Sequence, residues 1–107
     1  MILVTTDTVP GRTIVKSCGL VRGNAVRARH VGRDILAALR NIVGGEVFEY
    51  TKLMAESREQ AIDRMIDDAK RLGANGIVGM RFTTSFVSTG AAELLAFGTA
   101  VVVEDER

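Results

Sequence analysis

Apolar and polar residues repeat along the chain with two periods, one typical of a helix and one typical of strands. From residue 46 to residue 72, apolar side chains recur at about 100° per residue, which predicts one long amphipathic helix. Other stretches alternate between apolar and polar residues, or are apolar throughout, as strands are. The predicted strands span residues 2–5, 12–26, 77–87 and 92–104. The pattern therefore predicts an α+β fold in which a sheet packs against the long helix.

Turn-forming residues mark where these elements end. Pro10–Gly11 fits a type II turn, because proline presets the first central position and glycine permits a positive φ at the second. Gly73 is suited to end the long helix, and Asn75–Gly76 then turns the chain into the next strand. Residues 88–91 have the composition of a hairpin turn between the last two strands.

The segment between the second strand and the long helix is less regular. Gly19 and Gly23 predict a bulge or a bend within the strand that precedes it. Residues 27–33 form a basic connector, and Asp34 then begins a short helix that reaches about Val43. The sheet is therefore expected to pack against a short helix as well as the long one.

The long helix has an alternative that the pattern leaves open, and it contains a charge in an unusual place. Residues 57–60 could form a capping box that starts a second helix, but the apolar stripe keeps its phase there, which favours one helix. In that phase Arg58 falls in the middle of the stripe, where a charge must be paired or must reach water. We therefore expect a buried, structural Arg58 that bridges to a carboxylate, with Glu93 as one candidate, or to strand carbonyl groups; an arginine that holds a ligand is the alternative. Replacement of Arg58 by alanine should cost a few kcal/mol.

Composition and charge fit one globular domain covering residues 1–107. The chain is 47% hydrophobic and 25% charged, and its net charge of +1 gives no global attraction to nucleic acid or membrane. The single cysteine, Cys18, excludes an intrachain disulfide framework and fits a reducing compartment. The apolar N-terminal run has no basic leader and is too short for a signal peptide or a membrane span. We therefore expect a cytoplasmic protein without a membrane partner.

Both faces of the last predicted strand are apolar, which predicts an oligomer. Ala96, Gly98 and Ala100 are small enough for the long helix to approach one face closely. The other face would carry Leu95, Phe97, Val101 and Val103. An antiparallel sheet in a small monomer usually wets one face, and a patch of this size would exceed what soluble monomers normally expose. We therefore expect neighbouring subunits to cover these residues.

Short motifs along nearly the whole chain resemble the YbjQ family. The matching stretches are residues 8–11, 19–23, 41–46, 50–51, 64–65, 72–75, 78–79, 81–82 and 96–101. The resemblance implies a dodecin-like α+β subunit, with a helix against an antiparallel sheet, assembled as a homopentameric ring. It also brings a heavy-metal-binding label that rests on inference, and it implies no catalytic activity.

A metal site would need converging ligands, and the chain offers few. Cys18 and His30 are the candidates, and they lie twelve residues apart, outside any CxxC or HxxxH spacing. A closed zinc site takes four ligands, whereas one chain would supply these two and carboxylates. The alternative is that Cys18 is a small core residue. We therefore expect no tightly bound zinc or copper.

The basic connector suggests an anion site. The candidate ligands are Arg22, in the strand before the connector, and Arg27, Arg29 and Arg33 within it, and all precede the N-terminus of the short helix. Arginine guanidinium groups and free backbone N–H groups at a helix start can hold a phosphate or a carboxylate. Asp34 would compete with such an anion, so a solvated basic loop is the alternative. Nucleic acid is disfavoured because no aromatic residue is interleaved with these charges.

Three functions remain open from the sequence. The first is a non-enzymatic ring protein that binds a small ligand, an anion or a metal ion. The second is a structural homo-oligomer, or scaffold, with no small-molecule ligand. The third is an enzyme, for which we propose no catalytic residue, because no nucleophile, base and orienting group can be assigned and the single histidine limits triad chemistry. The residues do not identify a cofactor.

Overall fold

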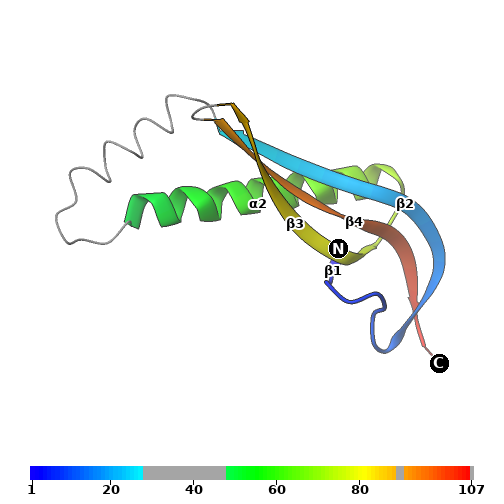
Figure 1. The fold of residues 1–107 in the computed structure, drawn as a ribbon. Helices are drawn as coiled ribbons and strands as arrows, with labels where there is room; N and C mark the ends of the chain where they lie inside the picture. Colours follow the sequence, from blue (N-terminus) through cyan, green and yellow to red (C-terminus); the bar gives the residue numbers. More distant parts are fainter. Residues whose placement is uncertain (28–47, 89–90, 107) are drawn as a thin grey trace.

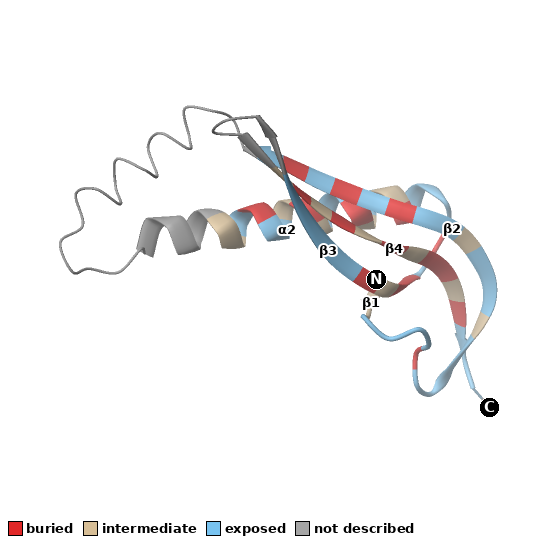
Figure 2. Cartoon of the chain, viewed as in Figure 1, coloured by how far each residue is buried: buried red, intermediate tan, exposed pale blue. Residues whose placement is uncertain are grey.

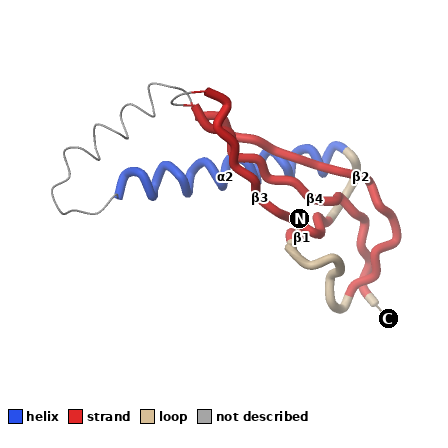
Figure 3. Tube along the Cα trace, viewed as in Figure 1, coloured by secondary structure: helices blue, strands red, loops and turns tan. Residues whose placement is uncertain are grey.

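The computed structural model describes residues 1–27, 48–88 and 91–106. The predicted short helix and the middle of the hairpin turn lie outside these residues. Within them, one helix packs on a four-stranded sheet (Figures 1 and 3). The elements are β1 (Ile2–Leu3), β2 (Arg12–Arg27), α2 (Phe48–Arg71), β3 (Gly76–Ser88) and β4 (Ala91–Asp105).

The sheet is mixed, whereas the sequence predicted an antiparallel one. The strand order is β1-β3-β4-β2, in which β4 is antiparallel to both β3 and β2, but β1 runs parallel to β3. β1 pairs with β3 only at Gly76 and Ile77. It is therefore shorter than the predicted strand over residues 2–5. β1 and β2 are consecutive in the chain but lie at opposite edges of the sheet. Residues 4–11 must therefore carry the chain from one edge to the other.

α2 continues through residues 57–60 without the break that the capping-box alternative would require. It buries a row of residues spaced four apart, Ser57, Ala61, Met65 and Ala69, against β2 and β4. The main chain of the helix comes unusually close to β2 at Gly23. A Cβ atom there would lie 2.2 Å from the carbonyl oxygen of Ala61 and 2.3 Å from the amide nitrogen of Met65. Gly23 thus allows this close approach, rather than forming the predicted bulge or bend.

The two faces of the sheet have separate cores within one chain. Ile77, Ala96 and Ala100 pack with α2 on one face. Successive residues of a strand point to opposite faces, so Val101, only 2% exposed, belongs to the other face. There it packs with Val103, Val78 and Val9. The N-terminal segment, residues 2–9, therefore covers residues that the sequence assigned to neighbouring subunits, and it replaces part of the expected subunit interface.

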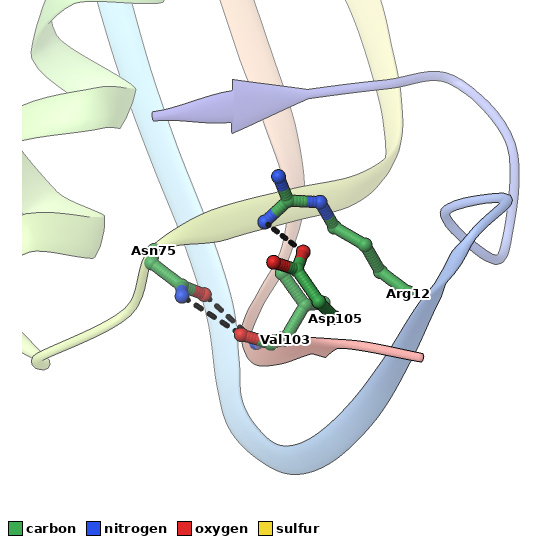
Figure 4. Close-up of polar contacts among 4 residues, drawn as sticks. All are labelled: Arg12, Asn75, Val103 and Asp105. Atoms are coloured by element: carbon green, nitrogen blue, oxygen red, sulfur yellow. Dashed lines mark hydrogen bonds and ion pairs between the residues drawn. The ribbon is translucent and has the colours of Figure 1, made fainter. Parts of the chain in front are cut away.

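Backbone and side-chain hydrogen bonds fasten this second core. Asn75, just before β3, both donates to and accepts from the main chain of Val103, at 2.9 and 2.8 Å (Figure 4). Arg12, at the start of β2, forms an ion pair with Asp105 at 3.4 Å (Figure 4). The amide of Ile2 donates to the carbonyl oxygen of Asn75 at 3.1 Å. Asn75 therefore ties the end of the helix, the N-terminus and β4 together.

Bulges in β2 decide which of its residues reach the cores. Extra residues occur in β2 between Ile14 and Lys16 and between Ser17 and Gly19. The predicted bulge at Gly19 is confirmed, and its φ of 104° is one that glycine adopts readily. Each extra residue reverses the alternation, so the two together restore it: Leu20 lies on the same face as Ile14, opposite α2, and it is 65% exposed. Figure 2 shows the regular alternation of exposed and buried positions in β2 after the second bulge, from residue 20 to residue 26.

We predict that Gly23→Ala destabilises the fold strongly. The added Cβ would clash with backbone atoms of α2, so the helix must move, and overpacking of this kind costs about 3 kcal/mol. Gly76→Ala is the matched control, because its Cβ would meet nothing closer than 3.5 Å. We expect it to change the free energy of unfolding by less than about 1 kcal/mol. Urea denaturation of both variants measures the difference, and equal midpoints would show that the close approach is not required.

Candidate functional site

The side chains of α2 cap the outer edge of β2. The backbone N–H of Arg22 donates to a carboxylate oxygen of Asp68 at 3.4 Å, and Arg64 donates from its guanidinium to the carbonyl oxygen of Asn24. Arg71 holds Asp68 in an ion pair at 3.0 Å. β2 is an edge strand, and these contacts satisfy groups that a further strand would otherwise use. The capped edge borders a depression, the edge groove, lined by Arg22, Gly23, Asn24, Arg64, Asp67 and Arg71.

The second candidate surface is the part of the sheet face opposite α2 that the N-terminal segment leaves uncovered. We call it the open face. Its members follow from the strand register, since residues that pair directly across strands share a face. They are Leu20, Arg22, Asn24 and Val26 of β2, Glu93, Leu95, Phe97 and Thr99 of β4, and Arg81, Thr83 and Ser85 of β3. β2 and β4 each contribute two apolar and two polar residues to it, and the three residues from β3 are all polar.

One row of the open face combines an aromatic ring with two positive charges. Phe97 on β4 pairs directly with Arg22 on β2 and with Arg81 on β3. Phe97 is partly exposed, and both arginines are exposed. Arg81 donates to the carbonyl oxygens of Thr5 and Met80, each at 2.8 Å, which anchors its guanidinium beside the N-terminal segment. This row brings together residues that are 16 and 75 positions apart in the sequence.

Of the four predicted anion ligands, the structure describes Arg22 and the main chain of Arg27. Arg22 lies on the open face and at the edge groove, and the main chain of Arg27 ends β2 opposite Ala92. Arg29 and Arg33 lie outside the described residues. The cations that the structure brings near Arg22 are instead Arg64 and Arg71 in the edge groove and Arg81 on the open face. The chain order offered no signal for these three, because only the register and the helix packing bring them together.

Arg58 is exposed, so the predicted buried ion pair is wrong. Positions four apart advance about 40° beyond a full turn, so the buried row winds around α2 as the helix crosses the sheet. At this end of the helix the row runs through Ser57, which is 1% exposed. The sequence pattern gives only one average apolar direction for the whole helix. That average direction passes through Arg58, whereas the buried row at this end of the helix does not. Glu93, the suggested partner, instead accepts a hydrogen bond from the side-chain amide of Asn24 at 3.2 Å.

The described residues do not form a metal site. Cys18 is a free thiol, partly buried, that packs against the core beneath α2. No three histidine, cysteine, aspartate or glutamate side chains gather to hold a metal ion within residues 1–27, 48–88 and 91–106. His30, the second predicted ligand, lies outside these ranges. In the part of the chain that the structure describes, the donor set therefore does not fit a heavy metal.

Comparison with known proteins places the chain in a family. Residues 1–104 match the YbjQ family model, which is described as "Putative heavy-metal-binding". The chain belongs to the UPF0145 family of YbjQ-like proteins. It is 60% identical over 107 residues to a UPF0145 protein of Pyrococcus furiosus, covering 100% of this chain and 94% of that protein. It is 52% identical to one of Methanosarcina acetivorans, covering 96% of this chain and 97% of the relative.

The UPF0145 chain also has a structural neighbour. A protein of unknown function from Pediococcus pentosaceus, of the DUF74 family, superposes with a TM-score of 0.66 over 97% of this chain and 98% of that one. At 16% identity this likeness shows the fold alone. Among the described residues, no helix combines the length and the apolar character needed to cross a membrane.

We predict that purified protein carries less than one zinc or copper ion per chain. Cys18 is the one cysteine or histidine among the described residues, and no three histidine, cysteine, aspartate or glutamate side chains gather there, whereas a tight site for these metals needs several ligands. Elemental analysis of protein purified without an affinity tag measures the content. One metal ion per chain, absent from a Cys18→Ala variant, would contradict this prediction and would support the label of the family.

Proposed function

We propose that this UPF0145 protein is a small, cytoplasmic, non-enzymatic homo-oligomer with dodecin-like subunits, which form a ring of five and bind a small ligand. The packing of one helix on the antiparallel strands β2, β4 and β3 supports the dodecin-like subunit. The number five rests on the family resemblance. The location rests on the free cysteine, which fits a reducing compartment.

The exposure of Phe82 carries the proposal of an oligomer. Phe82 pairs with Ala96 and so lies on the α2 side of the sheet, yet it is 40% exposed because α2 packs mainly over β2 and scarcely over β3. The N-terminal segment bonds to the main chain of β3 only as far as Met80. Beyond Met80, no described residue pairs with the outer edge of β3. An unpaired edge strand that also exposes an aromatic residue is a site for association with another chain.

Exposed apolar residues at the opposite edge favour a ring. On β2, Val15, Leu20 and Val26 are each more than half exposed. β2 and β3 flank β4 on opposite sides within the sheet. The apolar residues of β2 and the exposed Phe82 of β3 therefore face different directions. Contact between different patches of neighbouring copies is head-to-tail, and it gives a closed ring when the rotation between copies closes.

We predict that Phe82→Lys breaks the assembly. A charge at this position would have to be buried between subunits, which is costly without a partner. Light scattering on a size-exclusion column at low micromolar concentration should give five times the subunit mass for the wild type and a smaller mass for Phe82→Lys. Leu72→Lys is the matched control, because Leu72 is similarly exposed, at 45%, but lies at the end of the helix. A wild-type monomer would contradict the proposal, whereas another closed ring would contradict only the number five.

The alternative function is a scaffold with no small-molecule ligand, and ligand extraction separates the two. We predict that freshly purified native protein, extracted with organic solvent and analysed by mass spectrometry, releases a small organic anion. The positive charges that face the solvent on the open face and in the edge groove favour an anion over a cation. Extracts that contain no enriched small molecule, compared with an unrelated protein purified identically, would favour the scaffold.

A further inference from the structure

The row Arg22–Phe97–Arg81 has the chemistry of a site for a planar anion. Directly opposed residues of antiparallel strands have Cα atoms about 4.5–5.5 Å apart and point to the same face. Both arginines are paired in this way with Phe97. A partly exposed aromatic ring therefore has a guanidinium-bearing side chain on each side. Such a ring offers a stacking surface, and the arginines offer paired donors to phosphate.

The charges on this row are available to a ligand. The ion pairs among the described residues are Arg12–Asp105 and Arg71–Asp68, and neither includes Arg22 or Arg81. Arg81 uses one terminal nitrogen to hold two backbone carbonyl groups, which leaves its other N–H groups free to donate. The carboxylate of the open face, Glu93, lies two rows away and accepts a hydrogen bond from Asn24.

We propose that the open face binds a mononucleotide, with the base stacked on Phe97 and the phosphate held by Arg22 and Arg81. Inorganic phosphate would use only the arginines and would leave the ring without a role. The neighbouring side chains on the face, Leu95 and Thr99, extend the platform with one apolar and one polar group. This inference names the class of the small ligand in the proposed function and rests on that part of it, but it does not depend on the number of subunits.

The sheet supplies what the sequence pattern lacked. The basic connector has no aromatic residue among its charges, which argued against nucleic acid as its ligand. Strand pairing instead inserts Phe97 between an arginine from β2 and one from β3. The row contains one residue from each of three strands. Its size therefore suits a single base and phosphate better than a nucleic acid polymer.

The test is isothermal titration calorimetry of the native wild-type protein with AMP, adenosine and inorganic phosphate at low salt. We expect AMP to bind at least tenfold more tightly than either adenosine or phosphate, because only AMP uses the ring and both arginines. Phe97→Leu and Arg22→Gln should each weaken AMP binding about tenfold. Phe97→Tyr should keep the affinity, since it keeps the ring. Lys16→Gln, an exposed change on β2 away from the row, is the control and should leave binding unchanged.

Several outcomes would overturn the proposal. Equal affinity for phosphate and AMP would reduce the row to a simple anion site. Much tighter binding of a single-stranded oligonucleotide than of AMP would make the ligand a nucleic acid. Equal AMP affinity in Phe97→Leu and wild type would exclude stacking on the ring. Light scattering on each variant separates this inference from the proposed assembly: a monomer that binds AMP refutes only the ring, and a ring that binds no AMP refutes only the nucleotide.

Discussion

The contact between α2 and Gly23 of β2 is the constraint on which much of the structure depends. Because no side chain separates the helix from the strand at this point, α2 lies directly against β2 and extends over β4 but scarcely over β3. The helix can therefore bury a row of small residues and one methionine, and the same offset leaves Phe82 of β3 exposed. The exposed edge that the proposed assembly uses is thus a consequence of where the helix is held.

The same contact makes the two edges of the sheet different. It brings Arg64 and Asp68 of α2 to the rim of β2, where they satisfy backbone groups of Asn24 and Arg22. The outer edge of β3 beyond Met80 has no such cap among the described residues. A sheet with one capped edge and one open edge presents two unlike surfaces, which favours head-to-tail contact between copies over a symmetrical pairing of identical edges.

The N-terminal segment divides the other face of the sheet into a structural part and an available part. Asn75 and the bonds of residues 2–6 to β3 hold this segment in place, and Val9 then seals Val101 and Val103 from water. The open face begins where this cover ends, and Arg81 lies at the boundary, since it is bonded to the carbonyl oxygen of Thr5. A single short segment thus completes the second core and positions one of the two arginines of the proposed nucleotide site.

Local sequence determined the kind and approximate bounds of the described elements. The helical period predicted α2 to within two residues at its start, alternation predicted β2, β3 and β4, and Gly19 predicted a bulge. These features depend on interactions between residues near in sequence, which a repeating pattern records. The family resemblance was likewise carried by short local motifs, and the match over residues 1–104 confirms it.

Only the tertiary structure decided which residues meet. Two register shifts in β2 and two in β3 interrupt the alternation. Val78 and Met80, which a regular strand would place on one face, therefore pack in opposite cores. The crossing of α2 over the sheet removed Arg58 from the core, and the route of the N-terminal segment gave Val101 a cover within its own chain. The row Arg22–Phe97–Arg81 depends on the pairing of three strands. Sequence patterns report the period of one element at a time, whereas register, bulges and crossing angles are set by the packing of several elements together.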